Sequence, residues 1–415
     1  MHVLQAILAV VVLTGLAWGC SEARREVSLK WVFGGLLLQG LIAAVLLGIP
    51  ESLGLFLLAN RVALALTEAT REGTRFVFGY LGGGQTPFAV EESEHLFLLA
   101  FQGLPLILVV SALSALLFHW RILPWIVQGM AWLLRRGFSL RAPVGLGAVA
   151  SVFLGTVEAP LLVRPYLARM SRGELFALMV TGMATVSGSA VFLFATLLAE
   201  VVPNVTGHVL TASVLSVPAG LLVAGVLVPF RSAGAPAESA RIEVDSRSSV
   251  DALTRGTLEG IPLVLNIVAL LLTLMALVGL GNALLGLLPH PGGAPLSLER
   301  IVGWLMAPLA WLIGIPWKEA PQAGSLLGMK VVLNELIAYL QLADLPAEAL
   351  SERSRLLLTY ALCGFANLSS VGIVIGGLGA ILPDRRSEIL ALGMKSLLGG
   401  TLATLMTAAV VGAFL

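Results

Sequence analysis

Long apolar runs, separated by short polar segments, make up most of this chain. A run of about 20 apolar residues is long enough to cross a bilayer as a single helix. We predict a transmembrane helix in each of the runs of this kind: residues 3–20, 31–50, 95–118, 174–200, 206–230, 259–289, 356–382 and 388–414. The pattern therefore predicts an all-α membrane protein with eight transmembrane helices.

Two further apolar stretches, residues 142–163 and 318–341, are interrupted by Gly or Pro, and each carries one acid, Glu158 or Glu335. Backbone that is not helical is tolerated at membrane depth only where it is buried in protein or lines a cavity. A carboxylate at that depth is costly and marks a functional site by default. We therefore predict two re-entrant helical hairpins, each of which places its acid at a binding site.

A structural role is the alternative interpretation of both acids. Arg164 lies six residues after Glu158, and Lys330 lies five residues before Glu335, so each acid has a candidate ionic partner. Buried ion pairs contribute little net stability, because the cost of removing two charges from water offsets their attraction. This balance favours the functional interpretation.

The two halves of the chain share a pattern. In each half, the hairpin Glu is followed about thirty residues later by a Gly/Ser-rich interruption of a predicted helix, within residues 184–190 and 365–370. Polar side chains in these interruptions, Ser187 and Ser189 among them, are candidates for ligand contact. Two broken helices that pair with two hairpins indicate an inverted repeat, as in many secondary transporters.

Lys and Arg residues concentrate in segments that we place on the cytoplasmic side, which hold 17 of the chain's 25. These segments are residues 21–30, 119–141, 164–172, 231–257 and 383–395. The positive-inside rule then puts both the N-terminus and the C-terminus outside, and the two hairpins enter from opposite sides. Residues 51–75 mix apolar and charged positions, which is typical of a helix in the membrane interface. Residues 231–257 form a polar linker within a single membrane domain.

Composition excludes a soluble protein, because only 12% of the residues are charged and 58% are hydrophobic. A soluble domain has about 25% charged residues. The formal net charge of +1 indicates no nucleic-acid partner. The two cysteines and the scattered histidines show no metal-ligand spacing. Since no HExxH or GxSxG motif occurs, an intramembrane enzyme is the weaker rival of a transporter.

Two motifs in the second half carry a family resemblance. Residues Gly328–Glu335 fit the pattern G-x-K-x-x-x-N-E, and residues Ala361–Ser370 end in the sequence FANLSS. Residues 88–118 and the hairpin sequence at 155–160 match as well. With these motifs, the chain resembles the concentrative nucleoside transporter family over most of its length. The resemblance implies the architecture of the bacterial members. These have eight transmembrane helices and two hairpins, and they form homotrimers in which each subunit has a moving transport domain.

The resemblance also implies the substrate-binding residues. The ribose site would consist of Glu335, Asn367 and Ser370, with Phe365 beside the sugar. The base site would consist of Thr156, Val157 and Glu158. Family members carry a Gln and a hydroxyl residue at the first two of these base-site positions, so Glu158 would be the main polar anchor for the base. The preference for purine or pyrimidine stays open.

The coupling ion implied by the resemblance is sodium or a proton. Sodium-coupled relatives carry an Asn at the position of Ser151, and their other side-chain ligand falls on Thr185. Loss of an amide oxygen weakens a site that binds a hard cation through oxygen ligands. We therefore expect transport that responds to a pH gradient through Glu158 or Glu335 and does not strictly require sodium. If sodium is the ion, Ser151 and Thr185 are its expected ligands.

The chain is thus predicted to form one polytopic domain, residues 1–415. Within it, residues 95–141 and 259–300 would form a scaffold that also carries the oligomer contacts, and residues 142–230 and 318–415 the two transport halves. We expect a cation-coupled nucleoside symporter, without a cofactor, that imports nucleosides across a bacterial inner membrane by elevator-like alternating access. A symporter of another polar metabolite on the same scaffold is the alternative.

Overall fold

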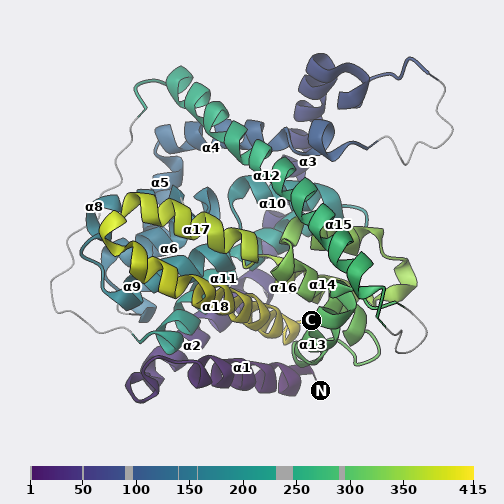
Figure 1. Cartoon of the computed structure of the whole chain (residues 1–415). Coiled ribbons are helices and arrows are strands. Elements are labelled where there is room, and N and C mark those ends of the chain that lie inside the picture. Colours follow the sequence, from purple (N-terminus) through teal and green to yellow (C-terminus); the bar gives the residue numbers. More distant parts are fainter. Residues whose placement is uncertain are drawn as a thin grey trace.

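The structure, a computed structural model, describes residues 2–48, 51–88, 97–138, 140–156, 158–229, 246–288 and 295–415. Across these ranges the chain forms helices and connections, and no strand (Figure 1). Six helical segments within them are long and apolar enough to cross a membrane: Leu29–Gly48, Leu99–His119, Arg172–Leu198, Val205–Leu227, Ser249–Leu285 and Pro383–Gly412. The predicted all-helical membrane fold is confirmed.

Five predicted spans correspond to single helices. They are α1 (His2–Gly19), α2 (Leu29–Gly48), α11 (Val205–Leu227), α12 (Ser249–Leu285) and α18 (Arg386–Gly412). α12 begins ten residues before the predicted start of its span, because Ser248 accepts a hydrogen bond from the Asp251 amide and caps the helix. The predicted linker therefore ends earlier than expected, and most of it lies outside the described residues.

The predicted span at residues 95–118 is only partly described. Residues 89–96 lie outside the described ranges, and the segment after them forms a short π-helix, Leu99–Gly103, followed by α4 (Leu106–His119). The predicted interfacial helix is α3 (Glu51–Phe78). Short 3-10 helices occur at other connections: Arg24–Glu26, Gly79–Gly82, Ala347–Ala349 and Pro383–Arg385.

Two predicted spans are broken in the middle. One consists of α9 (Arg172–Ala184) and α10 (Gly188–Leu198), and the other of α16 (Glu352–Leu362) and α17 (Leu368–Ile381). Each second half begins at a side-chain cap, since Ser187 accepts a hydrogen bond from the Ala190 amide and Asn367 accepts one from the Ser370 amide. Ser and Asn favour this position because their side chains satisfy amides at a helix start. The predicted interruptions are present.

Two helix–turn–helix segments stand at the predicted hairpins. The first consists of α6 (Ala142–Leu154) and α7 (Glu158–Leu161), followed by α8 (Arg164–Leu167), and the second of α14 (Ala320–Val332) and α15 (Glu335–Asp344). In both segments the acid singled out from the sequence is the first residue of the second helix. The two halves of the chain therefore repeat one arrangement, a hairpin followed by a broken helix.

Two helices were not predicted, α5 (Ile122–Phe138) and α13 (Leu298–Leu312). α5 buries one face at helical spacing, through Leu123, Val127, Ala131, Leu134 and Phe138. That periodicity is the sequence signal of an amphipathic helix. The arginines of the same segment indicate a cytoplasmic connection, and for this reason the helix was not predicted.

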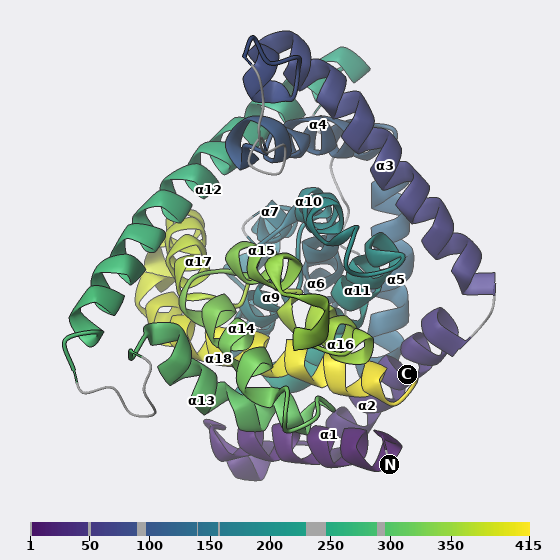
Figure 2. The same cartoon turned by 90° about the vertical axis from the view of Figure 1, so that its right-hand side faces the viewer.

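The helices form an outer frame and an inner body. α12 packs along α4, and α3 also contacts α4. In Figure 2, α3 and α12 diverge from the region of α4 and enclose the other helices, with α1 at the opposite edge. We call α3, α4 and α12 the frame. Leu265, Leu272 and Leu284 of α12 are 61–71% exposed, which suits a surface covered by lipid or by another membrane chain.

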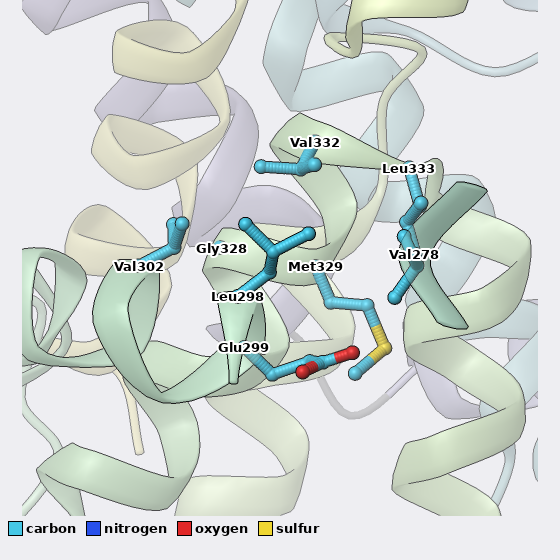
Figure 3. A pocket seen from close by; sticks show the side chains of 8 residues that line it. All are labelled: Val278, Leu298, Glu299, Val302, Gly328, Met329, Val332 and Leu333. Carbon is cyan, nitrogen blue, oxygen red and sulfur yellow. The ribbon is translucent and has the colours of Figure 1, made fainter. Parts of the chain in front are cut away.

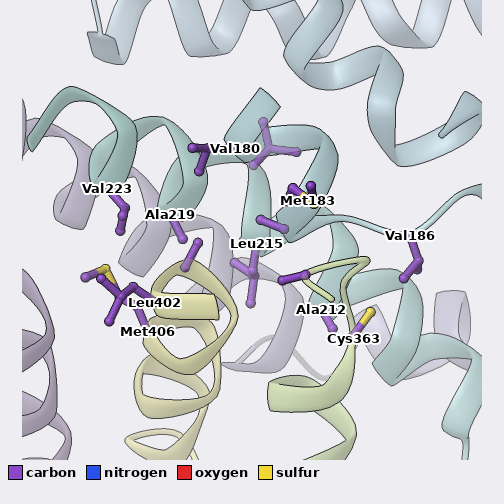
Figure 4. Packing of buried hydrophobic residues seen from close by; sticks show 14 of the residues in the cluster. Val180, Met183, Val186, Ala212, Leu215, Ala219, Val223, Cys363, Leu402 and Met406 are labelled. Carbon is purple, nitrogen blue, oxygen red and sulfur yellow. The ribbon is translucent and has the colours of Figure 1, made fainter. Parts of the chain in front are cut away.

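The centre of the inner body is packed by α9, α11 and α18 (Figure 4). α11 is buried on all sides over most of its length, as expected of a helix that is apolar all round. Glycines let α18 approach α9 closely: a Cβ at Gly400 would lie 2.6 Å from the Met183 Cβ atom. Small residues at helix contacts are the usual means of tight packing in membranes. Since α18 also packs against α16 and α17, this closely packed centre positions both helix breaks.

Candidate functional site

Glu335 and Asn367 form the buried centre of the site. The Asn367 Nδ2 amide donates a 2.8 Å hydrogen bond to the Glu335 carboxylate, while its Oδ1 atom accepts from the Ser370 amide at 2.7 Å. The exposed fractions of Glu335, Asn367 and Ser370 are only 6%, 2% and 6%. Glu335 also lies in the first turn of α15, where the helix dipole favours a negative charge. One amide side chain thus joins the tip of the second hairpin to the second helix break.

The two helix breaks cross each other. The Phe365 amide donates to the Thr185 carbonyl oxygen at 3.2 Å, so the unwound strips of α9–α10 and α16–α17 are bonded directly. Gly364 allows this approach, since a Cβ there would lie 2.7 Å from the Thr404 Cγ2 atom and 2.8 Å from the Ala184 carbonyl oxygen. Any larger residue would push the strips apart. Both breaks therefore lie at one place, where the two repeats meet.

A cavity of about 160 Å³ opens at this crossing. It is bounded by the tips of both hairpins, by both helix breaks, by α10, and by α4 and α12 of the frame. The lining residues are Ile107, Leu154, Gly155, Thr156, Glu158, Ser187, Ser189, Ala190, Leu193, Phe194, Leu263, Ile267, Asn334, Glu335, Leu336, Phe365, Asn367, Ser369, Ser370 and Ile373. The cavity thus lies between the frame and the inner body.

The structure brings together nearly all residues that the sequence singled out for substrate binding. Thr156, Glu158, Glu335, Phe365, Asn367 and Ser370 all line the cavity. Val157 lies outside the described residues. The frame residues of the wall were missed, because an apolar side chain that faces a cavity has the same sequence signal as one that faces lipid. Asn334 and Ser369 were also missed, although both stand inside the quoted motifs.

The two walls of the cavity differ in chemistry. Carboxylate, amide and hydroxyl groups gather at the hairpin tips and helix breaks, while α4 and α12 contribute aliphatic side chains. A pocket with a few convergent polar groups in an apolar lining is typical of small-molecule sites. Adjacent hydroxyl groups of a ligand match a carboxylate beside an amide, and Phe365 offers a flat apolar surface. The cavity therefore suits a small ligand with a polyhydroxyl end and an apolar end.

The two candidate ion ligands are in contact with each other. The Thr185 hydroxyl lies 3.0 Å from the Ser151 Oγ atom and donates to the Thr181 carbonyl oxygen at 2.9 Å. The exposed fractions of Ser151 and Thr185 are 2% and 0%, and neither residue lines the cavity. Hydroxyl and carbonyl oxygens are suitable ligands for a hard cation. The chemistry of these groups therefore fits an ion bound beside the first helix break.

A second, much smaller cavity of about 10 Å³ lies where α12 meets α13 and α14 (Figure 3). Its walls are mostly apolar, from Val278 of α12, Leu298 and Val302 of α13, and Met329 of α14. This volume is about that of a single water probe, and a water also needs polar partners. The space is therefore a packing gap at the contact of frame and second hairpin.

Charged side chains form a network at one end of the inner body. The Arg172 guanidinium donates two hydrogen bonds to the Glu22 carboxylate, at 2.9 and 3.0 Å, and the Lys395 ammonium donates another at 2.8 Å. These bonds, led by those from Arg172, lower the pKa of Glu22 from its ordinary value to about 2. The network joins the α1–α2 connection to the first residue of α9, Arg172, and to Lys395 in the third turn of α18. Three segments that were predicted to be cytoplasmic therefore lie together.

Three family profiles match the chain along its length. They are described as the Na+ dependent nucleoside transporter N-terminus, at residues 8–81, nucleoside recognition, at residues 100–201, and the Na+ dependent nucleoside transporter C-terminus, at residues 208–412. Together the three matches cover most of the chain and pass through both hairpins and both helix breaks.

Curated proteins from bacteria and animals are similar in sequence. The uncharacterized transporter YutK of Bacillus subtilis is 34% identical, and the match covers 100% of both chains. The nucleoside permease NupC of Helicobacter pylori is 32% identical over 99% of this chain and 97% of that protein. Solute carrier family 28 member 3 of Mus musculus is 32% identical over 92% of this chain and 54% of its own length.

Solved structures share the whole fold. The chain matches CNTnw in an inward-facing, substrate-bound state with a TM-score of 0.88 and 32% identity, over 100% of this chain and 99% of that one. A variant of CNTnw in an outward-facing state gives a TM-score of 0.90 and 33% identity, over 100% and 98%. The hairpins, helix breaks and frame thus belong to an architecture that has been solved in more than one state.

Proposed function

Because this chain belongs to the concentrative nucleoside transporter family, a family of membrane transporters and not of enzymes, we propose that it imports nucleosides by symport with a cation. The observation that carries the proposal is the Glu335–Asn367 hydrogen bond at the wall of the cavity. A carboxylate and an amide at this spacing match two neighbouring hydroxyl groups of a ribose.

The sugar would bind at the second hairpin and the second break. Its hydroxyl groups would donate to the Glu335 carboxylate and bond with Asn367 and Ser370, and Phe365 would lie against the sugar ring. Hydrogen bonds to an ionised group are about twice as strong as neutral ones. The base would extend toward Thr156, Val157 and Glu158 at the first hairpin.

Sodium is the coupling ion that the family descriptions support. The expectation of proton coupling came from a single position, Ser151, and the family descriptions do not support it. Two hydroxyl oxygens and the Thr181 carbonyl lie together at that place, which is compatible with a sodium ion. We propose sodium as the coupling ion. Uptake that is driven by a proton gradient without sodium would overturn this choice.

The two-body arrangement suggests how the site opens. The cavity lies between the inner body, residues 142–230 and 318–415, and the frame helices α4 and α12. Elevator-like movement of the inner body past the frame would expose the cavity to either side in turn. The predicted scaffold, residues 95–141 and 259–300, would then stay fixed and carry the contacts of a homotrimer, for which the exposed leucines of α12 offer a surface. We place the protein in a bacterial inner membrane with both termini outside.

Uptake into proteoliposomes tests the proposal. Purified protein is reconstituted, and uptake of radiolabelled uridine and adenosine is measured with an inward sodium gradient, with choline in place of sodium, and with a pH gradient alone. Sodium-driven accumulation of either nucleoside supports the proposal. Accumulation driven by the pH gradient without sodium overturns the choice of ion but not the substrate class. No uptake of any nucleoside, by protein that is folded in detergent, favours another polar metabolite.

A further inference from the structure

Lys330 is a buried cation that the proposed mechanism does not use. Its side chain is 1% exposed, and it stands two residues before the end of α14. The ammonium donates to the Ala361 carbonyl oxygen and to the Thr404 hydroxyl, both at 2.9 Å. Both acceptors are uncharged. Burial of an ammonium is costly unless it is paired or bonded, so these two bonds need an explanation.

Glu335 does not supply that explanation. Its carboxylate accepts a hydrogen bond from Asn367, and neither hydrogen bond of Lys330 goes to Glu335. A structural ion pair between these two residues, the alternative interpretation from the sequence, therefore does not account for where the ammonium lies. The ammonium instead lies at the C-terminal end of α16, beside the second helix break.

The first half of the molecule has polar groups at the matching place. Ser151 lies three residues before the end of α6 and contacts Thr185, which directly follows α9. Lys330 lies two residues before the end of α14 and bonds Ala361, one residue before the end of α16. In each repeat, the last turn of the first hairpin helix thus reaches the C-terminal end of the broken helix. The first repeat places hydroxyl groups there and the second places a cation.

A cation suits the end of α16 for electrostatic reasons. The last carbonyl groups of a helix have no partner within the helix, and they form the negative end of its dipole. Here the Tyr339 hydroxyl donates to the Thr359 carbonyl and the Lys330 ammonium to the Ala361 carbonyl. The unwound strip that carries Phe365 and Asn367 begins two residues later. The bond to Ala361 therefore holds the end of α16 in place, and with it the point at which the strip leaves the helix.

We propose that Lys330 is a tethered cation that occupies, in the second repeat, the place of the ion-binding hydroxyl groups in the first, and that it positions the strip 363–367 for sugar binding. The proposal rests on the proposed function. Thr404 of α18 is the second anchor, because it accepts from Lys330 and also contacts the position of Gly364. The ammonium thus bonds the last turn of α16, two residues before the strip, and Thr404 beside the strip at once. Lys330 is a positioning residue and does not line the cavity.

Substrate discrimination separates this role from a general loss of stability. A correctly placed Asn367 distinguishes a ribose from a 3′-deoxyribose, since the missing hydroxyl leaves a buried polar group without a partner, which costs about tenfold or more in affinity. Binding of uridine and 3′-deoxyuridine is measured for the wild type, for Lys330→Met and for the control Lys395→Met in the charged network. We expect Lys330→Met to bind uridine about tenfold more weakly and to lose most of its discrimination. A destabilised protein with correct geometry would bind less ligand but keep the ratio of the two affinities.

Cys363 provides a readout that needs no nucleoside. It is buried, it directly follows α16, and the chain's other cysteine, Cys20, is exposed. In a Cys20→Ser background, the rate at which a small maleimide alkylates Cys363 reports opening of the strip. We expect faster alkylation in Lys330→Met and in the isosteric Thr404→Val, and a wild-type rate in Lys395→Met. Propylammonium, which replaces the lost side-chain atoms of Lys330→Ala, should slow alkylation of that variant again.

The outcomes separate the inference from the proposed function. If wild-type protein binds nucleosides and Lys330→Met matches it in uridine affinity, discrimination and alkylation rate, the inference fails alone. If wild-type protein binds no nucleoside, the proposed function fails, and the alkylation rates still decide whether Lys330 holds the strip. Should Lys330→Met not fold, Thr404→Val decides: wild-type discrimination and a wild-type alkylation rate in that variant overturn the inference.

Discussion

At the scale of single residues, the site is built from side chains that also begin helices. Asn367 caps α17 through its Oδ1 atom and bonds Glu335 through its Nδ2 atom, so helix geometry fixes the orientation of the amide. Asn334 likewise caps α15 and lines the cavity. Groups that are held by helix starts lose little freedom when a ligand binds, which favours affinity.

Replacement of Glu335 by Gln tests sugar recognition. The variant keeps the shape but loses the charge, and a hydrogen bond to a charged group is worth about 1.5–3 kcal/mol. We expect uridine affinity to fall by about tenfold or more, as measured by calorimetry on purified protein. Glu348→Gln, on an exposed 3-10 helix, is the matched control. A folded Glu335→Gln protein with wild-type affinity would remove Glu335 from the site.

Replacement of Thr185 by Val tests the ion site. The change removes one of the two hydroxyl oxygens while it keeps the volume, and a hard cation depends on its oxygen ligands. We expect the sodium concentration for half-maximal uptake to rise several-fold, with an unchanged uridine KM at saturating sodium. Thr196→Val, which removes a hydroxyl that contacts Thr67 elsewhere, should leave the sodium dependence unaltered. Equal sodium curves for the two variants would place the ion elsewhere or favour protons.

At the scale of elements, the helix breaks matter more than the helices themselves. Each break frees backbone groups, and the bond from the Phe365 amide to the Thr185 carbonyl satisfies two of them by joining one repeat to the other. Backbone that is not helical is stable at membrane depth only under such conditions. The crossing is therefore the element most sensitive to a small increase in side-chain volume.

Gly364→Ala tests the close approach at the crossing. The new methyl group would lie within 2.8 Å of the Thr404 side chain and the Ala184 carbonyl, and overpacking of this kind costs typically about 1–3 kcal/mol. We expect a lower melting temperature and loss of uridine uptake. Gly372→Ala in α17, where a Cβ meets nothing within 4 Å, is the control and should melt at or above the wild-type temperature. Normal uptake by Gly364→Ala would show that the strips can separate without harm.

At the scale of the whole molecule, ion pairs tie the α1–α2 connection to two distant segments of the inner body. Glu22 bonds Arg172 and Lys395, which lie 150 and 373 residues further along the chain. The three segments share one end of the molecule, which agrees with their predicted placement on one side of the membrane. Arg385 extends the contact by donating to the Leu167 and Met170 carbonyl groups.

Acidification tests this network. Arg172 first, and then Lys395, lower the pKa of Glu22 to about 2. A carboxyl group with a lowered pKa contributes stability above its unfolded pKa, and this contribution is lost as the pH falls from about 4.5 toward 2. We expect the melting temperature of Glu22→Gln to lie below that of the wild type at pH 7 and to approach it as the pH falls from 5 to 3. A constant difference across this range would mean that the network does not act through the charge of Glu22.

The sequence by itself determined the class of the protein and its repeat. Membrane spans follow from the length of apolar runs, since the bilayer fixes that length. The positions of Glu158, Glu335, Ser187 and Asn367 follow from local rules, because a charge at membrane depth and a helix cap are each visible within one short segment. The repeat of a hairpin and a broken helix follows because both halves carry the same local pattern.

The tertiary structure alone decided which of these segments meet. The bond between Glu335 and Asn367, the crossing at Thr185 and Phe365, and the contact of Lys330 with Thr404 each join residues that are far apart in the chain. The apolar cavity wall from α4 and α12 was also decided at this level. Hydropathy reports that a side chain leaves water, but it does not distinguish lipid, protein and cavity as the destination. That choice depends on the packing of the whole chain.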